Sequence, residues 1–353
     1  MMQGKTPQEL AMELERQRNA KADYLADTRE LEMSHGITGV SLGLNGQALS
    51  LNEIAHGQIA NKTGIPVKYY DRMLETQPEL LAHNVNTWFN REPETRMVRT
   101  LDGTARAFLS DRYRRIDNAE IAEAVLPIIL DMPGATVDSC ELTDRRMYIK
   151  VINERIQTEI VPGDVVQSGI LISNSEVGLG SVTVMPLVYR LVCANGMIAA
   201  DSGQRKFHIG RVNESDGNYE VFRSVTIEAE DKAFVMKLQD IVRATADEVQ
   251  FERIVTAMRK ATDAKITSPD VPKVVQLASK DFGITENEGK GILDQLIRSE
   301  ELSLYGLANA VTRHAQDVGS YDRSTELEMS AWSILNMTRK KWSDINEYAD
   351  RSA

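Results

Sequence analysis

Apolar positions recur at helical spacing in the first part of the chain, alternate with polar ones in the middle, and return to helical spacing in the last third. Residues 6–32 predict one amphipathic helix, because Thr6 and Glu9 form a capping-box pattern and Pro7 suits the first helical position. The charges of both signs on its surface are typical of a helix that faces solvent or a partner.

A helix–glycine–helix pattern follows in residues 52–90. The first helix is expected to stop at Gly64, and Pro66 then opens a second helix that contains Lys68 and Arg72. One interpretation is a helix-turn-helix that binds DNA. The other is a packed helical hairpin, which the pattern favours because a recognition helix normally offers more donors than these two basic side chains.

Hairpins dominate the strand-rich part of the chain. Asn45-Gly46 and Asp102-Gly103 are strong two-residue turn signals, and each lies between runs in which apolar and polar residues alternate. Runs rich in β-branched residues follow at residues 146–152, 167–173 and 180–193. Because few helices separate these hairpins, we expect an α+β fold with a central antiparallel sheet.

The last part of the chain is helical almost to its end, with predicted helices at residues 228–261, 270–282, 286–299, 300–318 and 325–349. We therefore expect three parts. They are an N-terminal amphipathic helix in residues 1–36, a central α+β domain in residues 37–212 and a C-terminal helical domain in residues 213–353.

Composition and charge narrow the class of protein. No run reaches the ~18 apolar residues of a membrane helix, and the N-terminus lacks the apolar core of a signal peptide, so we expect a cytoplasmic protein that does not bind membranes. Cys140 and Cys193 are expected to be buried, reduced thiols. The net charge is −11, and most of it lies after residue 211, which still permits a basic face in the middle of the chain.

Motifs of known catalytic chemistry are missing from the sequence. The five histidines are scattered without metal-ligand spacing, and there is neither a phosphate-binding glycine loop nor a nucleophile elbow. We therefore expect no catalytic residues, no cofactor and no metal. An unrecognised enzyme remains an alternative, because catalytic residues can assemble from distant positions.

Arginine and tyrosine recur together in the strand-rich part. Arg146, Tyr148 and Lys150 lie two apart on one predicted strand and therefore share a face. Arginine binds phosphate with its planar fork and stacks on bases, as single-stranded nucleic acid requires. The residues expected at such an interface are Arg99, Arg106, Arg112, Tyr113, Arg114, Arg115, Arg146, Tyr148, Lys150 and Arg190. The alternative is the solvent-facing polar side of an antiparallel sheet, which needs no ligand.

Six stretches carry a resemblance to a known family: GIPVKYYDRM at 64–73, NTWF at 86–89, LSDRYRRID at 109–117, SNSEVG at 173–178, YRLVCANGM at 189–197 and NAVTRH at 309–314. They resemble the phage/plasmid-like protein family, a domain of unknown function found on mobile elements, over about residues 37–335. Ala194 departs from the hydroxyl residue expected before Asn-Gly. The resemblance implies a role in replication, recombination or counter-defence. A more distant likeness is to phage single-strand annealing proteins, which form rings and hold single strands in a basic groove.

Together these observations lead us to expect a non-catalytic protein that binds single-stranded DNA in recombination or replication of a mobile element, as a homo-oligomer. The alternative is a counter-defence or regulatory protein that binds a host protein through its acidic helices, which include Asp317, Asp322, Glu326 and Glu328. If those helices shield the basic patch, removing residues 213–353 should tighten DNA binding.

Overall fold

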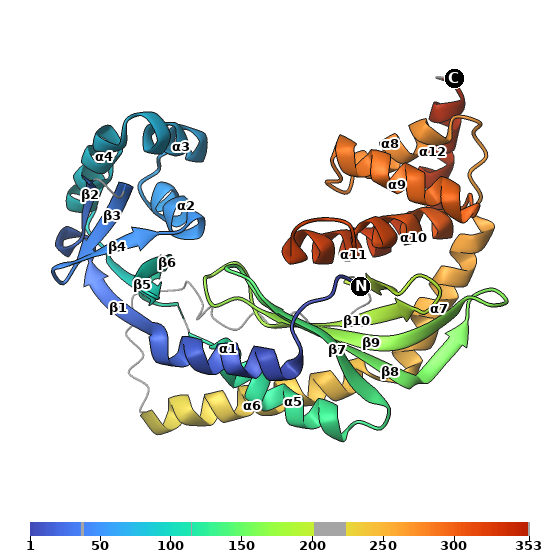
Figure 1. Ribbon diagram of the computed structural model, residues 1–353, viewed down its shortest axis with the longest axis horizontal. Helices are drawn as coiled ribbons and strands as arrows, with labels where there is room; N and C mark the ends of the chain where they lie inside the picture. The colour runs from blue at the N-terminus through green and yellow to red at the C-terminus, as the bar shows by residue number, and fades with distance from the viewer. Residues whose placement is uncertain (37–38, 114, 201–223, 352–353) are drawn as a thin grey trace.

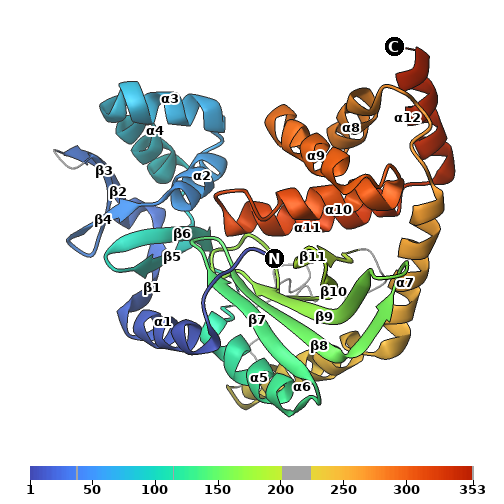
Figure 2. The ribbon, with the colours of Figure 1, turned by 45° about the vertical axis from the view of Figure 1, so that its right-hand side comes forward.

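The computed structural model describes residues 1–36, 39–113, 115–200 and 224–351. The described residues form two sheets and a C-terminal group of helices, which confirms the predicted α+β class. Figures 1 and 2 show an N-terminal lobe built on the first sheet, and a larger body in which the second sheet lies between two layers of helices.

The first sheet has six strands in the order β1-β5-β6-β4-β3-β2. They are β1 (Lys21–Asp27), β2 (Glu32–Gly36), β3 (Gly39–Leu44), β4 (Gln47–Leu51), β5 (Thr95–Leu101) and β6 (Thr104–Ser110). Both predicted hairpin turns are present, because Asn45 and Asp102 each have a φ of 51° and the glycine after each has a φ of 76°. The sheet is mixed rather than purely antiparallel, since β4 pairs with β6 in parallel.

Three helices cover one face of this sheet and complete the N-terminal lobe: α2 (Glu53–Lys62), α3 (Val67–Thr76) and α4 (Pro78–Arg91). Phe89 of α4 stacks on Phe108 of β6, with 5.6 Å between the ring centroids. These rings lie in an apolar cluster with side chains of all three helices. The helical pair predicted around Gly64 is therefore present and packed.

The predicted helix over residues 6–32 is wrong in its second half. Helix α1 (Pro7–Ala20) begins at the predicted Thr6–Glu9 capping box, but the chain then extends as β1 and pairs with β5, with Lys21 opposite Leu101. The stabilising partner of β1 lies far along the chain, so local periodicity could not reveal the strand. Helix α1 packs instead on the second sheet (Figure 2).

The second sheet is an antiparallel meander in the order β11-β10-β9-β8-β7. Its strands are β7 (Ala135–Leu142), β8 (Met147–Glu159), β9 (Val165–Asn174), β10 (Thr183–Arg190) and β11 (Asn195–Ile198). One face packs on α1, α5 (Asn118–Asp131) and α6 (Ser224–Thr245). The other lies beneath α10 (Leu304–His314) and α11 (Tyr321–Leu335), so helices cover both faces (Figure 1).

The remaining helices are α7 (Glu248–Asp263), α8 (Val271–Lys280), α9 (Glu286–Ser299) and α12 (Arg339–Arg351). The helices predicted at 228–261 and 325–349 are each broken in two, as α6 with α7 and α11 with α12. At each break a polar side chain starts the second helix: Asp247 accepts a hydrogen bond from Val249 N, and Thr338 accepts one from Lys341 N.

One apolar core joins the second sheet to the C-terminal helices. Val166, Val188 and Met197 of the sheet belong to the same cluster as Tyr305 and Trp332 of the helices. Removing residues 213–353 would therefore uncover one face of the sheet and take α6 away from the other, so the truncated chain would not report on the shielding of a basic patch. Strands β1 and β2, which precede residue 37, likewise belong to the same sheet as β3 to β6.

Two expectations from composition can be compared with the structure. Cys140 is buried as expected, whereas Cys193 is only partly buried. Among the described residues, no helix combines the length and the apolar character that a membrane span requires.

Acid is expected to weaken the contact between α9 and α11. Hydrogen bonds from Arg323, at 2.8 Å, and from Thr285 lower the pKa of Glu288 from 4.5 to about 2. Because the folded-state pKa is depressed, this stabilisation is present above pH 4.5 and is lost as the pH falls toward 2. Urea unfolding should show Glu288→Gln less stable than the parent by about 1 kcal/mol or less near neutral pH, since the site is partly exposed. A difference that persists undiminished in acid would contradict this assignment.

Candidate functional site

Arg99 and Arg106, two of the predicted nucleic-acid contacts, lie inside a joint between the two sheets. Arg99 has 0% exposure and donates to Asp23 Oδ1 at 2.8 Å, Asp117 Oδ1 at 2.7 Å and the Glu176 carbonyl at 2.9 Å. Arg106 donates to Glu176 Oε2 at 2.6 Å. Both guanidinium groups are used within the chain, so neither presents its charge to a surface ligand.

The sequence stretches 109–117 and 173–178 supply the other side of this joint. Glu176 Oε1 accepts a hydrogen bond from Asn118 N at 2.6 Å, and Tyr113 OH donates to the Ser175 carbonyl at 3.1 Å. Burial raises the pKa of Tyr113 and also tends to raise that of Asp117, but hydrogen bonds from Lys21 and Arg99 hold the pKa of Asp117 below its usual 3.8. Two of the stretches behind the family resemblance therefore have a structural role in this fold.

The predicted stripe on β8 faces α11 rather than a ligand or solvent. Tyr148 OH donates to Asp322 Oδ1 at 2.7 Å, and Lys150 Nζ donates to Glu328 Oε2 at 2.6 Å. The Lys150 ammonium also lies 4.7 Å from the ring centroid of Tyr321. The prediction that Tyr148 and Lys150 lie on an open face that binds nucleic acid is therefore wrong, because α11 covers that face of the sheet.

The same contacts bear on the predicted acidic surface. Asp322 and Glu328 bind partners within the chain, as just described. Asp317 and Glu326 are more exposed and form ion pairs with Arg313 and Arg323 of their own helical region. A host-protein surface made of these four acids would therefore present only part of their charge.

Arg190 is also used within the chain. Its guanidinium donates to Asp164 Oδ1 at 2.6 Å and Oδ2 at 2.9 Å, and Tyr305 OH of α10 donates to the same carboxylate at 2.7 Å. Nearby, the amide of Asn195 donates to Thr312 Oγ1 at 2.5 Å. The stretches 189–197 and 309–314 thus contact each other and dock α10 on the sheet.

Arg112 and Arg115 are the exposed members of the predicted set, and Arg114 lies outside the described residues. Arg115 is 3.4 Å from Asp23 Oδ2 and keeps 57% of its side chain exposed. Arg112 has no carboxylate within ion-pair distance in the part of the chain that the structure describes. The structure therefore brings Arg99, Arg106, Tyr113 and Arg115 together at the joint, but it buries the guanidinium groups of Arg99 and Arg106.

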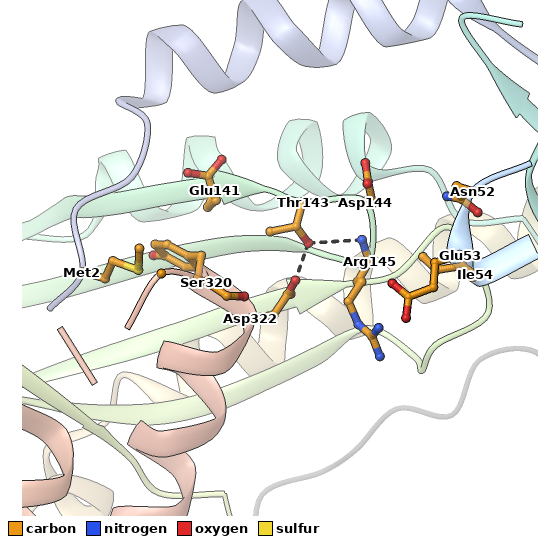
Figure 3. A pocket seen from close by; sticks show the side chains of 12 residues that line it. Met2, Asn52, Glu53, Ile54, Glu141, Thr143, Asp144, Arg145, Ser320 and Asp322 are labelled. Atoms are coloured by element: carbon orange, nitrogen blue, oxygen red, sulfur yellow. Dashed lines mark hydrogen bonds between the residues drawn. The ribbon is translucent and has the colours of Figure 1, made fainter. Parts of the chain in front are cut away.

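Two cavities flank the turn between β7 and β8, which spans residues 143–146; we call them the turn cavities. The first is about 440 Å³ and is lined by Met2, Asn52, Glu53, Ile54, Glu141, Thr143, Asp144, Arg145, Gly319, Ser320, Tyr321 and Asp322 (Figure 3). The second is about 430 Å³ and lies over the joint, with Arg16, Arg106, Arg145 and Arg146 among its lining residues. Asn52, Thr143, Asp144 and Arg145 line both cavities.

Hydrogen bonds hold the turn in one conformation. Thr143 Oγ1 accepts the backbone N–H of Arg145 at 3.2 Å and that of Arg146 at 3.0 Å, and donates to Asp322 Oδ1 at 3.1 Å. In Figure 3 the Arg145 side chain extends into the first cavity, toward the same side as Glu53. The rigid turn therefore places a cationic side chain between two concave surfaces.

Arg145 and Arg146 differ from the other arginines of the second cavity. Arg16 pairs with Glu13 and Asp102, and Arg106 pairs with Glu176. Arg146 donates to the carbonyl of Leu179, and within the described ranges neither Arg145 nor Arg146 has a carboxylate at ion-pair distance. Arg145 is not among the residues predicted from the sequence, although it stands beside Arg146 in the arginine-rich part of the chain.

The lining has mixed charge. Glu53 lines the first cavity and Asp144 lines both, and neither forms an ion pair with another described residue. Glu141 and Asp322 also line the first cavity, so the site is not simply basic. Guanidinium groups bind phosphate, and carboxylates accept hydrogen bonds from amino groups. Among the residues described, no group of three or more metal-binding side chains occurs. The arrangement suits binding of a ligand that has both anionic groups and amino groups.

Comparison with known proteins gives one match. A family model described as a domain of unknown function, DUF932, matches residues 107–346. No curated protein and no solved structure matches the chain. The matched range includes the turn at residues 143–146, the second sheet and α10 with α11.

Proposed function

We propose that this protein, which belongs to the DUF932 family, a domain of unknown function, binds single-stranded DNA without catalysis, in recombination or replication. The binding site is the pair of turn cavities. The observation that supports this proposal most is the pair of adjacent arginines, Arg145 and Arg146, on a rigid turn between two cavities and without carboxylate partners in the described part of the chain. Unpaired guanidinium groups gain most from a phosphate, because no existing ion pair has to be broken.

A single strand fits this site better than a duplex. Duplex DNA is stiff over about 50 nm, so bending it into two concave surfaces on either side of one turn would cost free energy. A single strand can follow such a path with its backbone. Its bases also expose their amino groups, and Glu53 and Asp144 can accept hydrogen bonds from them. In a duplex, the base edges that carry these amino groups are largely used in base pairing.

The carboxylates also set an upper limit on affinity. Glu53 and Asp144 repel phosphates, so binding should be modest and should weaken steeply with salt. Fluorescence anisotropy with labelled single strands and duplexes, titrated at low and moderate salt, measures both properties. We expect single strands to bind more tightly than a duplex of the same length at these cavities.

Replacing both unpaired arginines should weaken single-strand binding. Arg145→Ala with Arg146→Ala removes two charge-assisted contacts and should lower the affinity by about tenfold or more. The slope of log affinity against log salt should fall by about 1.4, since each phosphate contact contributes about 0.7 on a single strand.

A charge-matched variant controls for non-specific attraction. Lys290→Ala with Arg298→Ala removes two exposed positive charges from α9 and should leave binding nearly unchanged. The proposal fails if single strands do not bind at low salt. It also fails if the two double variants lower the affinity equally.

A further inference from the structure

We infer that α2 and α3 form a helix-turn-helix whose second helix binds the major groove of duplex DNA. This motif lies on the N-terminal lobe, outside the family match. The first residues of α2 line the first turn cavity, but no residue of α3 lines either turn cavity, so the α3 surface does not depend on the proposed single-strand site. Figures 1 and 2 show α3 at the top of that lobe, above α2.

The connector has the length and the backbone conformation of this motif. Helix α2 ends at Lys62 and α3 begins at Val67, which leaves a four-residue connector. Gly64 within it has a φ of +66°, a conformation that glycine adopts without strain. The N–H of Ile65 returns to the Ala60 carbonyl at 3.0 Å, which closes the end of α2.

Buried contacts fix α3 relative to α2. Tyr70 has 0% exposure and Met73 has 2%, and both belong to the apolar cluster of the N-terminal lobe. Tyr70 OH is 2.8 Å from His56 Nδ1 of α2, which ties the two helices together. This packing fixes the orientation of α3 about its own axis and therefore determines which of its side chains face outward.

The outward side of α3 presents hydrogen-bond donors. Lys68, Tyr69, Arg72 and Thr76 are exposed, and at 100° per residue they occupy adjacent positions on one side of the helix. Tyr69 keeps 47% of its surface exposed. Neither Lys68 nor Arg72 forms an ion pair with another described residue, so both charges are available to phosphates and to guanine edges.

Position along the helix supports the same inference. In a helix-turn-helix the first residues of the second helix contact base edges, and Lys68 and Tyr69 are the second and third residues of α3. The first turn of α3 contains no acidic residue. Asp71 and Glu75 lie next to the donor side and are exposed, so they oppose phosphate binding and should keep the affinity low.

The full chain can test this surface with a labelled duplex of mixed sequence at low salt. Lys68→Ala with Arg72→Ala should weaken duplex binding by about tenfold, because it removes two charge-assisted contacts. Asp71→Asn with Glu75→Gln should strengthen it several-fold, because it removes repulsion next to the same contacts. Opposite changes from neighbouring residues would localise the duplex to this helix.

Two comparisons separate this surface from the turn cavities. Lys68→Ala with Arg72→Ala should leave single-strand binding unchanged, and Arg145→Ala with Arg146→Ala should leave duplex binding unchanged. The α9 variant with Lys290→Ala and Arg298→Ala serves again as the charge-matched control. The inference is overturned if no duplex binds at low salt, or if the α3 variant and the α9 variant have equal effects.

Discussion

Glu328→Gln is expected to lower the free energy of unfolding by about 3 to 5 kcal/mol, because it leaves a buried ammonium group without its carboxylate. Lys150 has 0% exposure and Glu328 has 1%, and the two are 2.6 Å apart between β8 and α11. The neutral amide can still accept a hydrogen bond but no longer balances the charge. Urea unfolding monitored by circular dichroism, with the midpoint and slope both fitted, measures the loss.

Two further variants separate a buried-charge effect from a general loss at a salt bridge. Asp294→Asn breaks an exposed pair on α9, in which Arg298 is 71% exposed, and should cost at most about 1 kcal/mol. Lys150→Met with Glu328→Leu removes both charges and should recover most of the stability lost in the single variant. A loss below about 1 kcal/mol for Glu328→Gln would show that the pair does not hold α11 on the sheet.

Local pattern was sufficient where neighbours in sequence determine the structure. The hairpin turns at Asn45-Gly46 and Asp102-Gly103 form as predicted, because their left-handed backbone depends on residue type alone. The helix predicted at 286–299 spans Glu286–Ser299, and its Thr285–Glu288 capping box defines its start.

The sequence pattern gave wrong predictions where residues that are distant in the sequence determine the local structure. Strand β1 exists because β5 pairs with it, and the two faces of β8 look alike in sequence until α5 and α11 cover them. Alternation correctly placed Tyr148 and Lys150 on one face of a strand, but it could not show that Asp322 and Glu328 face them from α11. The side chains predicted to bind DNA and the acidic side chains predicted to bind a host protein therefore bind each other.

Contacts between residues that are distant in the sequence also limit how much of the candidate site could be predicted. Of the ten residues selected from sequence, Arg146 lines a turn cavity as an unpaired cation, and Arg106 lines one as part of an ion pair. Arg145 could be ranked above its neighbours only after the ion pairs of the joint were known. Composition shows where arginines are common, and only the fold shows which of them lack an acidic partner.

Arg99→Met should destabilise the protein by about 3 kcal/mol at neutral pH, because Asp23 and Asp117 would then face each other without the cation between them. Arg115→Met is a matched control, since Arg115 approaches the same Asp23 carboxylate at 3.4 Å with 57% of its side chain exposed. Its loss should stay below about 1 kcal/mol. Equal losses for the two variants would contradict a special role for the buried guanidinium.

The pH dependence of this loss tests its cause. The pKa of Asp117 lies below 3.8 in the folded chain, because hydrogen bonds from Lys21 and Arg99 outweigh the effect of burial. Its stabilisation is therefore present above pH 3.8 and is lost as the pH falls through the lower folded-state value. The gap in urea midpoint between the parent and Arg99→Met should narrow below pH 3.8, whereas a gap caused by lost packing alone would persist there. Since Arg99 connects β5 to the loop at Glu176 beside the second turn cavity, a charge-driven loss would also link the stability of the joint to the geometry of the proposed single-strand site.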